Sequence, residues 1–284
     1  MSADPIAALE SLGYTGREAA FLYLVAAHSG YFLRRQFDYF ADRNKGALVM
    51  RFLRKACAAR HVEVLDYGQR WHVYHLAART IYRLMGDAES QNRRRKGDAQ
   101  IRARLMALDY VLEQDGDRYL ESEADKARFF IDSRGIAPKI AIADQGRLHP
   151  LLASMPIAIA DPGSLHLSLV RFAFIDEGMS TTEKFLRFLS VADALLRAVG
   201  TFEVVYVSNS DLNFSDAETA FRRQFLSPVA RRPSLFDADR QQESSAILPL
   251  DSVGHRPQFS TLLLRSSFPK LRRNAQGVLS GVHL

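Results

Sequence analysis

Hydrophobic residues in the first hundred positions recur at helical spacing and then, over a short stretch, alternate with polar ones. Thr15, followed three residues later by Glu18, is a capping-box pattern that begins a helix, and Gly30 is a suitable residue to end it. Two β-prone, alternating runs separated by a turn around Gly68 predict a hairpin. The pattern as a whole predicts three helices, this hairpin and a short closing helix, over residues 14–30, 33–39, 46–60, 59–76 and 78–86.

The third of these helices separates apolar from basic residues. Placed about 100° apart, its apolar residues fall within an arc of about 140°. They are Leu48, Val49, Phe52, Leu53 and Ala56. Arg51, Arg54 and Lys55 lie on the opposite face, and Asn44 and Lys45 precede the helix. One face can therefore pack on a core while the other enters the major groove of DNA, where Arg binds guanine, Asn binds adenine and Lys contacts phosphate.

Positive charge is concentrated in the same region. Residues 1–98 hold 16 Lys and Arg against 10 Asp and Glu, an excess of 6, which equals the net charge of +6 of the whole chain. The remaining residues therefore carry no net charge. Residues 31–60 alone hold eight basic residues against Asp38 and Asp42. Charge focused in this way attracts polyanions more strongly than the same charge spread evenly.

Three helices followed by a hairpin are typical of a winged helix-turn-helix. We therefore predict that residues 1–86 form such a domain and bind double-stranded DNA. A solvated amphipathic helix beside a scaffolding hairpin is the alternative. Arg34 and Arg35 of the second helix, and Arg70 at the hairpin tip, are further candidate DNA contacts. The segment over residues 87–98 is predicted to be a basic linker, and its "NRRRK" run is either solvated or an arm that lies along DNA.

The remaining polar residues of this region suggest packing rather than chemistry. His72 and His75 are three residues apart on a predicted strand, so they face opposite sides, one exposed and one packed, and do not form a metal site. The single cysteine, Cys57, excludes an internal disulfide and a cysteine-clustered zinc site, and we interpret it as a packing residue. The chain has no membrane-length apolar run and no secretory signal. We expect a cytoplasmic protein that uses no metal or cofactor.

The second half of the chain has the pattern of an α/β domain. Apolar runs rich in β-branched and aromatic residues predict strands over residues 137–144, 155–161, 165–176, 202–210 and 258–267. Amphipathic patterns predict helices over residues 180–200 and 213–225, and two more, over residues 99–114 and 122–134, that pack between the two parts. The predicted fold class is thus α+β or α/β, with a winged helix-turn-helix followed, over residues 99–284, by a small α/β domain with a mixed sheet and a loop at residues 229–257.

Three stretches of the chain resemble the replication-relaxation family of plasmids and mobile elements. They are "FLRKACAARHVEVLDYGQRWHVYHL", "FAFIDEGMSTTEKFLRFLSVADALL" and "FEVVYVSN", and the resemblance extends over residues 12–224. It implies a DNA-binding protein that controls replication, mobilisation or transcription of such an element. It also implies that the second domain is similar to a degenerate restriction-endonuclease core. Separately, we expect that this second domain either dimerises or recruits a partner.

A nuclease of the PD-(D/E)xK type needs two acids at neighbouring strand ends to hold Mg²⁺, and a Lys two residues beyond the second acid. Asp161, Asp176 and Glu177 are at suitable positions, but Gly178 and Met179 occupy the positions of the Lys. Lys184, on the next helix, would have to reach back. Acids that cap a turn and a helix N-terminus fit the pattern equally well. We therefore expect a DNA-binding protein without catalytic activity, and a metal-dependent nuclease targeted by the winged domain is the alternative.

Overall fold

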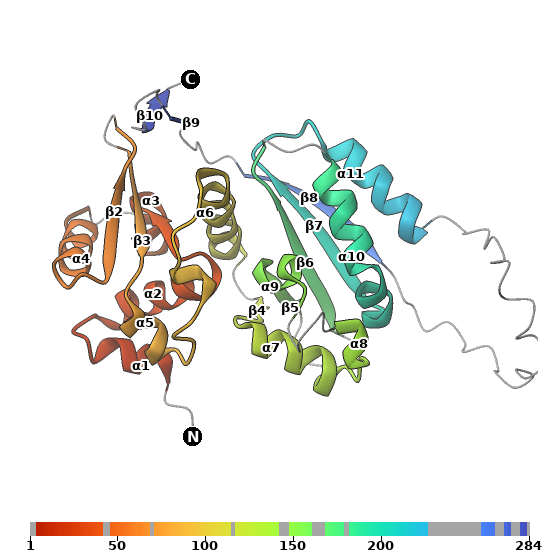
Figure 1. Ribbon diagram of the computed structural model, residues 1–284, viewed down its shortest axis with the longest axis horizontal. Helices are drawn as coiled ribbons and strands as arrows, with labels where there is room; N and C mark the ends of the chain where they lie inside the picture. The colour runs from red at the N-terminus through yellow and green to blue at the C-terminus, as the bar shows by residue number, and fades with distance from the viewer. Residues whose placement is uncertain are drawn as a thin grey trace, which may run out of the picture.

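A computed structural model of the protein describes residues 4–41, 46–68, 71–114, 117–141, 148–160, 168–178, 182–226, 257–264, 270–273 and 279–282. It shows a mixed α and β protein. A helical N-terminal part with a small sheet packs, through one long helix, against a larger sheet that carries helices on its far side (Figure 1). Of the predicted loop at residues 229–257, only residue 257 lies within the described residues.

The N-terminal part contains the three predicted helices, the hairpin and the closing helix in the predicted order, with a helix and a strand in addition. The elements are α1 (Pro5–Glu10), α2 (Gly16–His28), β1 (Tyr31–Leu33), α3 (Arg34–Phe40), α4 (Gly46–Ala58), β2 (Val62–Asp66), β3 (His72–Leu76) and α5 (Arg79–Leu84). The additional helix α1 begins at Pro5, and the Asp4 carboxylate caps it by accepting from the Ile6 N–H at 3.0 Å. The additional strand β1 pairs antiparallel with β3 over three residues.

The predicted capping box of α2 is confirmed. The Glu18 carboxylate accepts from the Thr15 backbone N–H at 2.9 Å, and the Thr15 hydroxyl accepts from the Glu18 N–H at 3.4 Å. After α2 the chain turns at Gly30, whose φ of +78° is one that glycine adopts without strain. A Cβ at this position would lie 2.1 Å from the Asn92 carbonyl oxygen. Both the backbone conformation and the close approach therefore require glycine there.

The small sheet has the strand order β1-β3-β2 and is covered on both faces. Its front face contributes Phe32, Val62, Tyr74 and Leu76 to a core shared with α2, α3 and α4. Its back face contributes Tyr31, Leu33, Leu65 and Val73 to a second cluster, which is closed by Ile101 and Leu105 of α6 (Asp98–Glu113). Because successive side chains of a strand point to opposite faces, each strand of this sheet contributes to both cores.

The predicted linker at residues 87–98 lies against the N-terminal part. It contains the short helix η1 (Gln91–Arg93), in which Asn92 is buried. The Asn92 side-chain amide donates to the carbonyl oxygens of Ala26 and Ala27, at 2.9 and 3.0 Å, near the end of α2. Farther along, the backbone N–H of Lys96 donates to the Tyr31 hydroxyl at 2.8 Å. These contacts hold the basic segment beside the small sheet.

The second part is built around a mixed sheet of order β4-β5-β6-β7-β8. Its elements after α6 are β4 (Arg118–Tyr119), α7 (Glu123–Arg128), η2 (Phe129–Ser133), α8 (Pro138–Ala141), α9 (Pro150–Ser154), β5 (Ile157–Ala160), β6 (Leu169–Asp176), α10 (Glu183–Val199), β7 (Phe202–Ser208), α11 (Phe214–Phe221), η4 (Arg222–Leu226) and β8 (Gln258–Leu263). β6, β7 and β8 run parallel, whereas β4, β5 and β6 pair antiparallel. A mixed sheet in this part was predicted and is confirmed. A separate antiparallel pair, β9 (Lys270–Arg273) and β10 (Leu279–Val282), follows.

The strand predicted at residues 137–144 is wrong over its described portion, because Pro138–Ala141 form the short helix α8. Proline is well suited to a first helical turn, and an apolar run of four residues does not by itself distinguish a strand from a helix. Residues 142–144 lie outside the described part of the chain.

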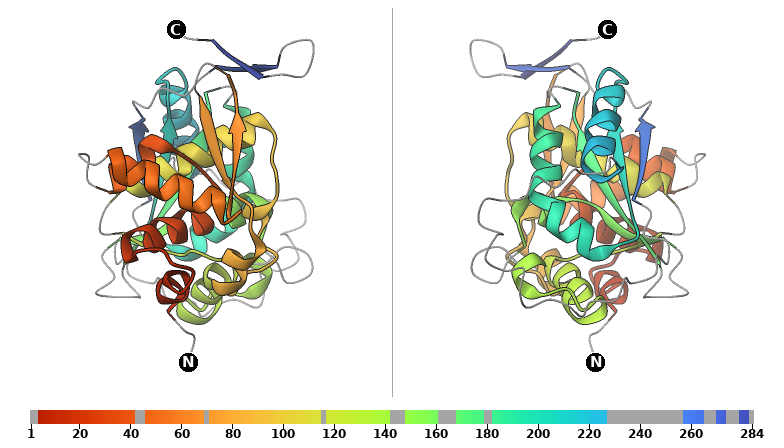
Figure 2. Two further views of the ribbon diagram at one scale, coloured as in Figure 1. Left: turned by 90° about the vertical axis from the view of Figure 1, so that its left-hand side faces the viewer. Right: turned by 90° about the vertical axis from the view of Figure 1, so that its right-hand side faces the viewer.

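Helix α6 packs against both the small sheet and the large sheet. Its first half closes the back face of the small sheet, whereas Met106, Tyr110 and Val111 of its second half pack against Ala173, Val205, Val207 and Leu264 of the large sheet. The other face of that sheet packs against α10 through Phe185, Phe188, Leu189, Ala192 and Val199. The prediction that the helix at residues 99–114 packs between the two parts is confirmed. Figure 1 shows this layering from left to right, and Figure 2 looks onto its two outer sides. Among the described helices, none is long and apolar enough to cross a membrane.

Candidate nucleic-acid interface

Helix α4 has one buried face and one solvent face, as its sequence predicts. Val49, Phe52, Leu53 and Ala56 are buried in the core with α2 and α3, and Leu48, also expected on this face, is half-buried. The exposed residues are Gly46, Ala47, Met50, Arg51, Arg54 and Ala58. Helix α4 contains no Asp or Glu, and the charged residues of its outward face are Arg51 and Arg54. It lies beside β2 on the outer side of the N-terminal part, away from α10 and α11 (Figure 2).

Four of the arginines predicted to contact DNA, Arg34, Arg35, Arg51 and Arg54, are exposed. Arg51 and Arg54 lie one turn apart on the outward face of α4, and the Arg54 Nε donates to the Met50 carbonyl oxygen at 3.3 Å. Arg34 is exposed at the first position of α3. Neither Arg34 nor Arg51 forms an ion pair with a carboxylate among the described residues. Their guanidinium groups can therefore take up an external anion without first giving up a carboxylate partner.

Lys55 is placed differently from the prediction. Its ammonium lies 2.5 Å from a carboxylate oxygen of Glu18, donates to the Gly13 carbonyl oxygen at 2.9 Å, and sits over the Tyr14 ring. Burial alone would raise the pKa of Glu18, but the hydrogen bond from Lys55 holds that pKa below its ordinary value. Lys55 thus links α4 to the start of α2, and contact with a phosphate would compete with that link.

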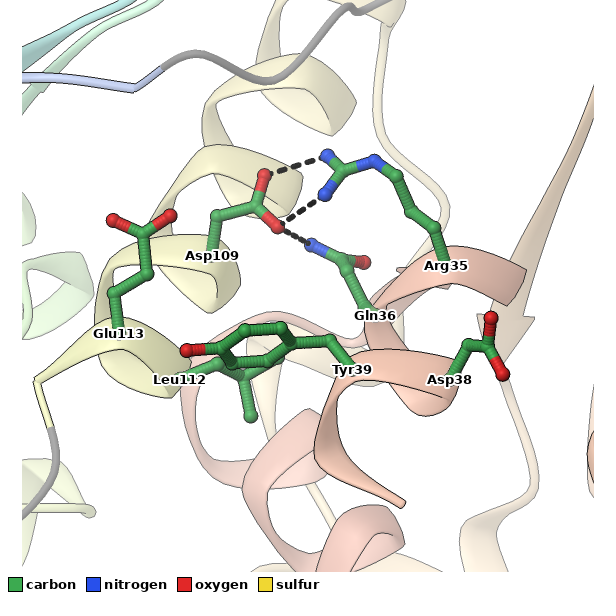
Figure 3. A pocket seen from close by; sticks show the side chains of 7 residues that line it. All are labelled: Arg35, Gln36, Asp38, Tyr39, Asp109, Leu112 and Glu113. Atoms are coloured by element: carbon green, nitrogen blue, oxygen red, sulfur yellow. Dashed lines mark hydrogen bonds and ion pairs between the residues drawn. The ribbon is translucent and has the colours of Figure 1, made fainter. Parts of the chain in front are cut away.

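Arg35 is exposed but pairs with a buried carboxylate. Its two terminal nitrogens donate to the two carboxylate oxygens of Asp109 in α6, at 2.8 and 2.7 Å, and the Gln36 amide donates to the same carboxylate at 2.9 Å (Figure 3). Gln36 further donates to the Leu105 carbonyl oxygen at 2.8 Å. This bidentate pair joins α3 to α6 across 74 positions of sequence. Arg35 was predicted to contact DNA, and in the structure its guanidinium pairs with Asp109.

A pocket of about 360 Å³ lies between α3 and α6 around this pair. Besides Arg35, its charged lining residues are Asp38, Asp109 and Glu113, so its carboxylates outnumber its cations (Figure 3). Burial, followed by the nearby Asp109 charge, raises the pKa of Glu113, although Arg35 partly opposes this. Such a lining repels phosphate, and the pocket is therefore no extension of the cationic surface on α4.

The hairpin beside α4 closes at Gly68, which has a φ of +76°. The Gly68 N–H donates to the Asp66 carboxylate, and the Trp71 N–H donates to the Gly68 carbonyl oxygen, both at 2.8 Å. The prediction that one of the two histidines is exposed and the other packed is confirmed. His72 is exposed, whereas His75 is buried and stacks on Tyr31 at 4.4 Å between ring centroids. Of the other predicted contacts, Arg70 at the hairpin tip lies outside the described residues, as do Asn44 and Lys45 before α4.

The acids predicted as weak catalytic candidates lie at the carboxyl end of β6. Asp176 is buried and accepts from the Tyr206 hydroxyl at 2.7 Å, the Asn213 amide at 3.1 Å and the Gly178 N–H at 3.0 Å. Glu177 is also buried and lies 2.6 Å from the Lys184 ammonium. These acids therefore already stabilise the turn after β6 and the start of α10. Asp161 lies outside the described part of the chain.

The backbone explains why no lysine follows these acids directly. Gly178 has a φ of +73°, and a Cβ there would lie 2.3 Å from the Asn209 side-chain oxygen. A side chain at position 178 would be strained by the backbone even if Asn209 moved aside. Lys184 does reach back, as the alternative required, but it reaches Glu177 rather than Asp176. Over the described ranges, no group of three or more His, Cys, Asp or Glu is arranged to hold a metal ion.

Sequence reasoning missed Asp109 and Met50. Asp109 is an acid inside the buried run "LMALDYVLE", and a carboxylate in such a run needs a cationic partner, which is a signal that could have been found. Met50 interrupts the polar face of an amphipathic helix, which is a second signal of the same kind.

Comparison of the chain with protein-family models, with curated proteins and with solved structures found no match.

Proposed function

We propose that this protein binds double-stranded DNA in a sequence-specific manner. In this proposal α3 and α4 act as a helix-turn-helix, with α4 in the major groove, and the β2–β3 hairpin acts as the wing. The observation that carries the proposal is the outward face of α4, which presents Arg51 and Arg54 and has no carboxylate along the entire helix. The buried face of the same helix is fixed to the core, so the cations are held on a rigid element.

The dimensions and the chemistry are compatible with this role. A helix of 13 residues is about 20 Å long, and the major groove of B-form DNA, about 12 Å wide, admits a helix. Arginine binds guanine bidentately through its O6 and N7 atoms and contacts phosphate equally well. Arg34 lies at the start of the neighbouring helix, where a phosphate contact would orient α4.

The biological role that we propose is control of replication, mobilisation or transcription of a plasmid or mobile element, in the cytoplasm. It is supported by the resemblance of three sequence stretches to the replication-relaxation family. Half-exposed Leu186 on α10 and Leu226 on η4 support the further proposal that two copies pair through the second part.

The test is duplex binding measured as a function of salt. For about five to eight phosphate contacts, the logarithm of the association constant falls with the logarithm of salt concentration with a slope of about −4 to −7. Arg51→Ala and Arg54→Ala should each make that slope shallower by about 1. Arg187→Ala, an exposed arginine on α10, is the matched control and should leave the slope unchanged. A slope near zero for the unaltered protein would exclude the proposal.

A further inference from the structure

Met50 is an apolar residue on the cationic face of α4. It is 40% exposed, and it belongs to none of the hydrophobic clusters formed by the described residues. It lies between Ala47, one turn earlier, and Arg54, one turn later, with Arg51 beside it. This spacing of three and four residues places all four side chains on one stripe of the helix.

The surroundings of Met50 extend the apolar character of this stripe. Val64 of β2, the strand against which α4 packs, is 47% exposed on the sheet face turned toward α4. Ala47 is exposed and has the smallest side chain of the stripe, so it allows a close approach to the helix backbone. Core packing therefore does not account for Met50, and its place beside Arg51 makes it available to the partner that Arg51 contacts.

The major groove of DNA offers one apolar group at its base edges, the C5 methyl of thymine. A flexible thioether side chain is well suited to contact such a methyl, because it adapts its rotamers to a small apolar target. Arg51, the next residue, offers the guanidinium fork that guanine requires. Met50 and Arg51 are neighbours on the helix, so they can reach adjacent base pairs in one docked arrangement.

We propose that Met50 determines sequence specificity by contacting a thymine methyl, next to a guanine contacted by Arg51. The inference rests on the proposed DNA-binding function and adds to it the preferred sequence, a thymine adjoining a guanine. Ala47 lies over the same groove floor and leaves room for Met50 to reach it.

The experiment first selects preferred duplexes from a random library with the full-length protein. Each thymine of the selected site is then replaced by uracil, which pairs identically and lacks only the methyl group, and affinity is measured by fluorescence anisotropy. We expect one such replacement to weaken binding by about three- to tenfold, in line with the loss of one buried methyl group.

Three variants test whether Met50 is the residue that distinguishes thymine from uracil. Met50→Ala should bind thymine and uracil duplexes alike, whereas Met50→Leu should keep the difference because it remains apolar and long. Leu212→Ala, at an exposed apolar residue between β7 and α11, should behave like the unaltered protein.

The outcomes separate this inference from the proposed function. If the unaltered protein binds no duplex, the proposed function itself is wrong. If it binds a selected site and every uracil replacement is silent, DNA binding stands and methyl recognition by Met50 is refuted. If uracil weakens binding equally in the unaltered protein and in Met50→Ala, another residue contacts the methyl group, and the assignment to Met50 is refuted.

Discussion

The ion pair between Arg35 and Asp109 gives the most direct test of how the N-terminal part is joined to α6. The Arg35 side chain is 40% exposed, whereas that of Asp109 is only 6% exposed. The two single substitutions therefore leave unpaired groups that differ in their exposure to water. Arg35→Ala leaves a buried carboxylate with the Gln36 amide as its remaining partner in this network. Asp109→Ala leaves an arginine that water can solvate and a Gln36 amide that still donates to the Leu105 carbonyl oxygen.

The magnitudes follow from this asymmetry. Removing one partner of a fully buried pair costs about 3–5 kcal/mol, and a hydrogen bond to a charged group contributes about 1.5–3 kcal/mol. We expect Arg35→Ala to lower the free energy of unfolding by about 3 kcal/mol, because an almost buried charge loses two hydrogen bonds. Asp109→Ala should lower it by about 1–2 kcal/mol, since the arginine left behind is largely hydrated. The double variant should cost less than the sum of the two single variants.

The assay is urea unfolding followed by far-ultraviolet circular dichroism, together with duplex binding by each folded variant. Asp38→Ala is the matched control, since Asp38 is a half-buried acid that lines the same pocket, and its change should stay within about 0.5 kcal/mol. If Arg35→Ala leaves stability unchanged and weakens DNA binding, the structural assignment of Arg35 is wrong and its predicted role as a DNA contact is correct.

Three further predictions concern other contacts. Lys55→Ala should lower the free energy of unfolding by about 1 kcal/mol without loss of DNA affinity. Because the pKa of Glu18 lies below its ordinary 4.5, the stability contributed by the Lys55–Glu18 pair is present above pH 4.5 and is lost as pH falls through the lowered pKa. Unfolding curves of Glu18→Gln should lack this pH dependence. Gly30→Ala should cost about 2–4 kcal/mol in urea unfolding, because a methyl group would meet a backbone carbonyl, whereas Gly86→Ala, with similar φ and open space around it, should cost about 1 kcal/mol; equal losses would contradict the close-approach argument. Asp176→Asn should destabilise by about 1 kcal/mol and leave duplex affinity unchanged, and Mg²⁺-dependent nicking that stops in this variant would instead support the nuclease.

Local patterns were sufficient for the elements that carry the candidate interface. Thr15 and Glu18 set the start of α2, because a capping box uses only neighbouring backbone groups. The buried and exposed faces of α4 follow from helical spacing alone, and the hairpin follows from alternation around Gly68. Each of these features depends on contacts a few residues apart, so the sequence was informative there.

The tertiary structure decided which cations remain available. Lys55 and Arg54 adjoin in the sequence, yet Lys55 meets Glu18 from 37 positions away and Arg54 is exposed. Arg35 likewise turns toward Asp109, 74 positions along the chain. Periodicity assigns a residue to a face of its own helix but carries no information on which distant carboxylate packs against that face. The sequence thus determined the helices of this interface and the sign of their surface charge, whereas the packing of α2 and α6 determined which of those cations have a carboxylate partner.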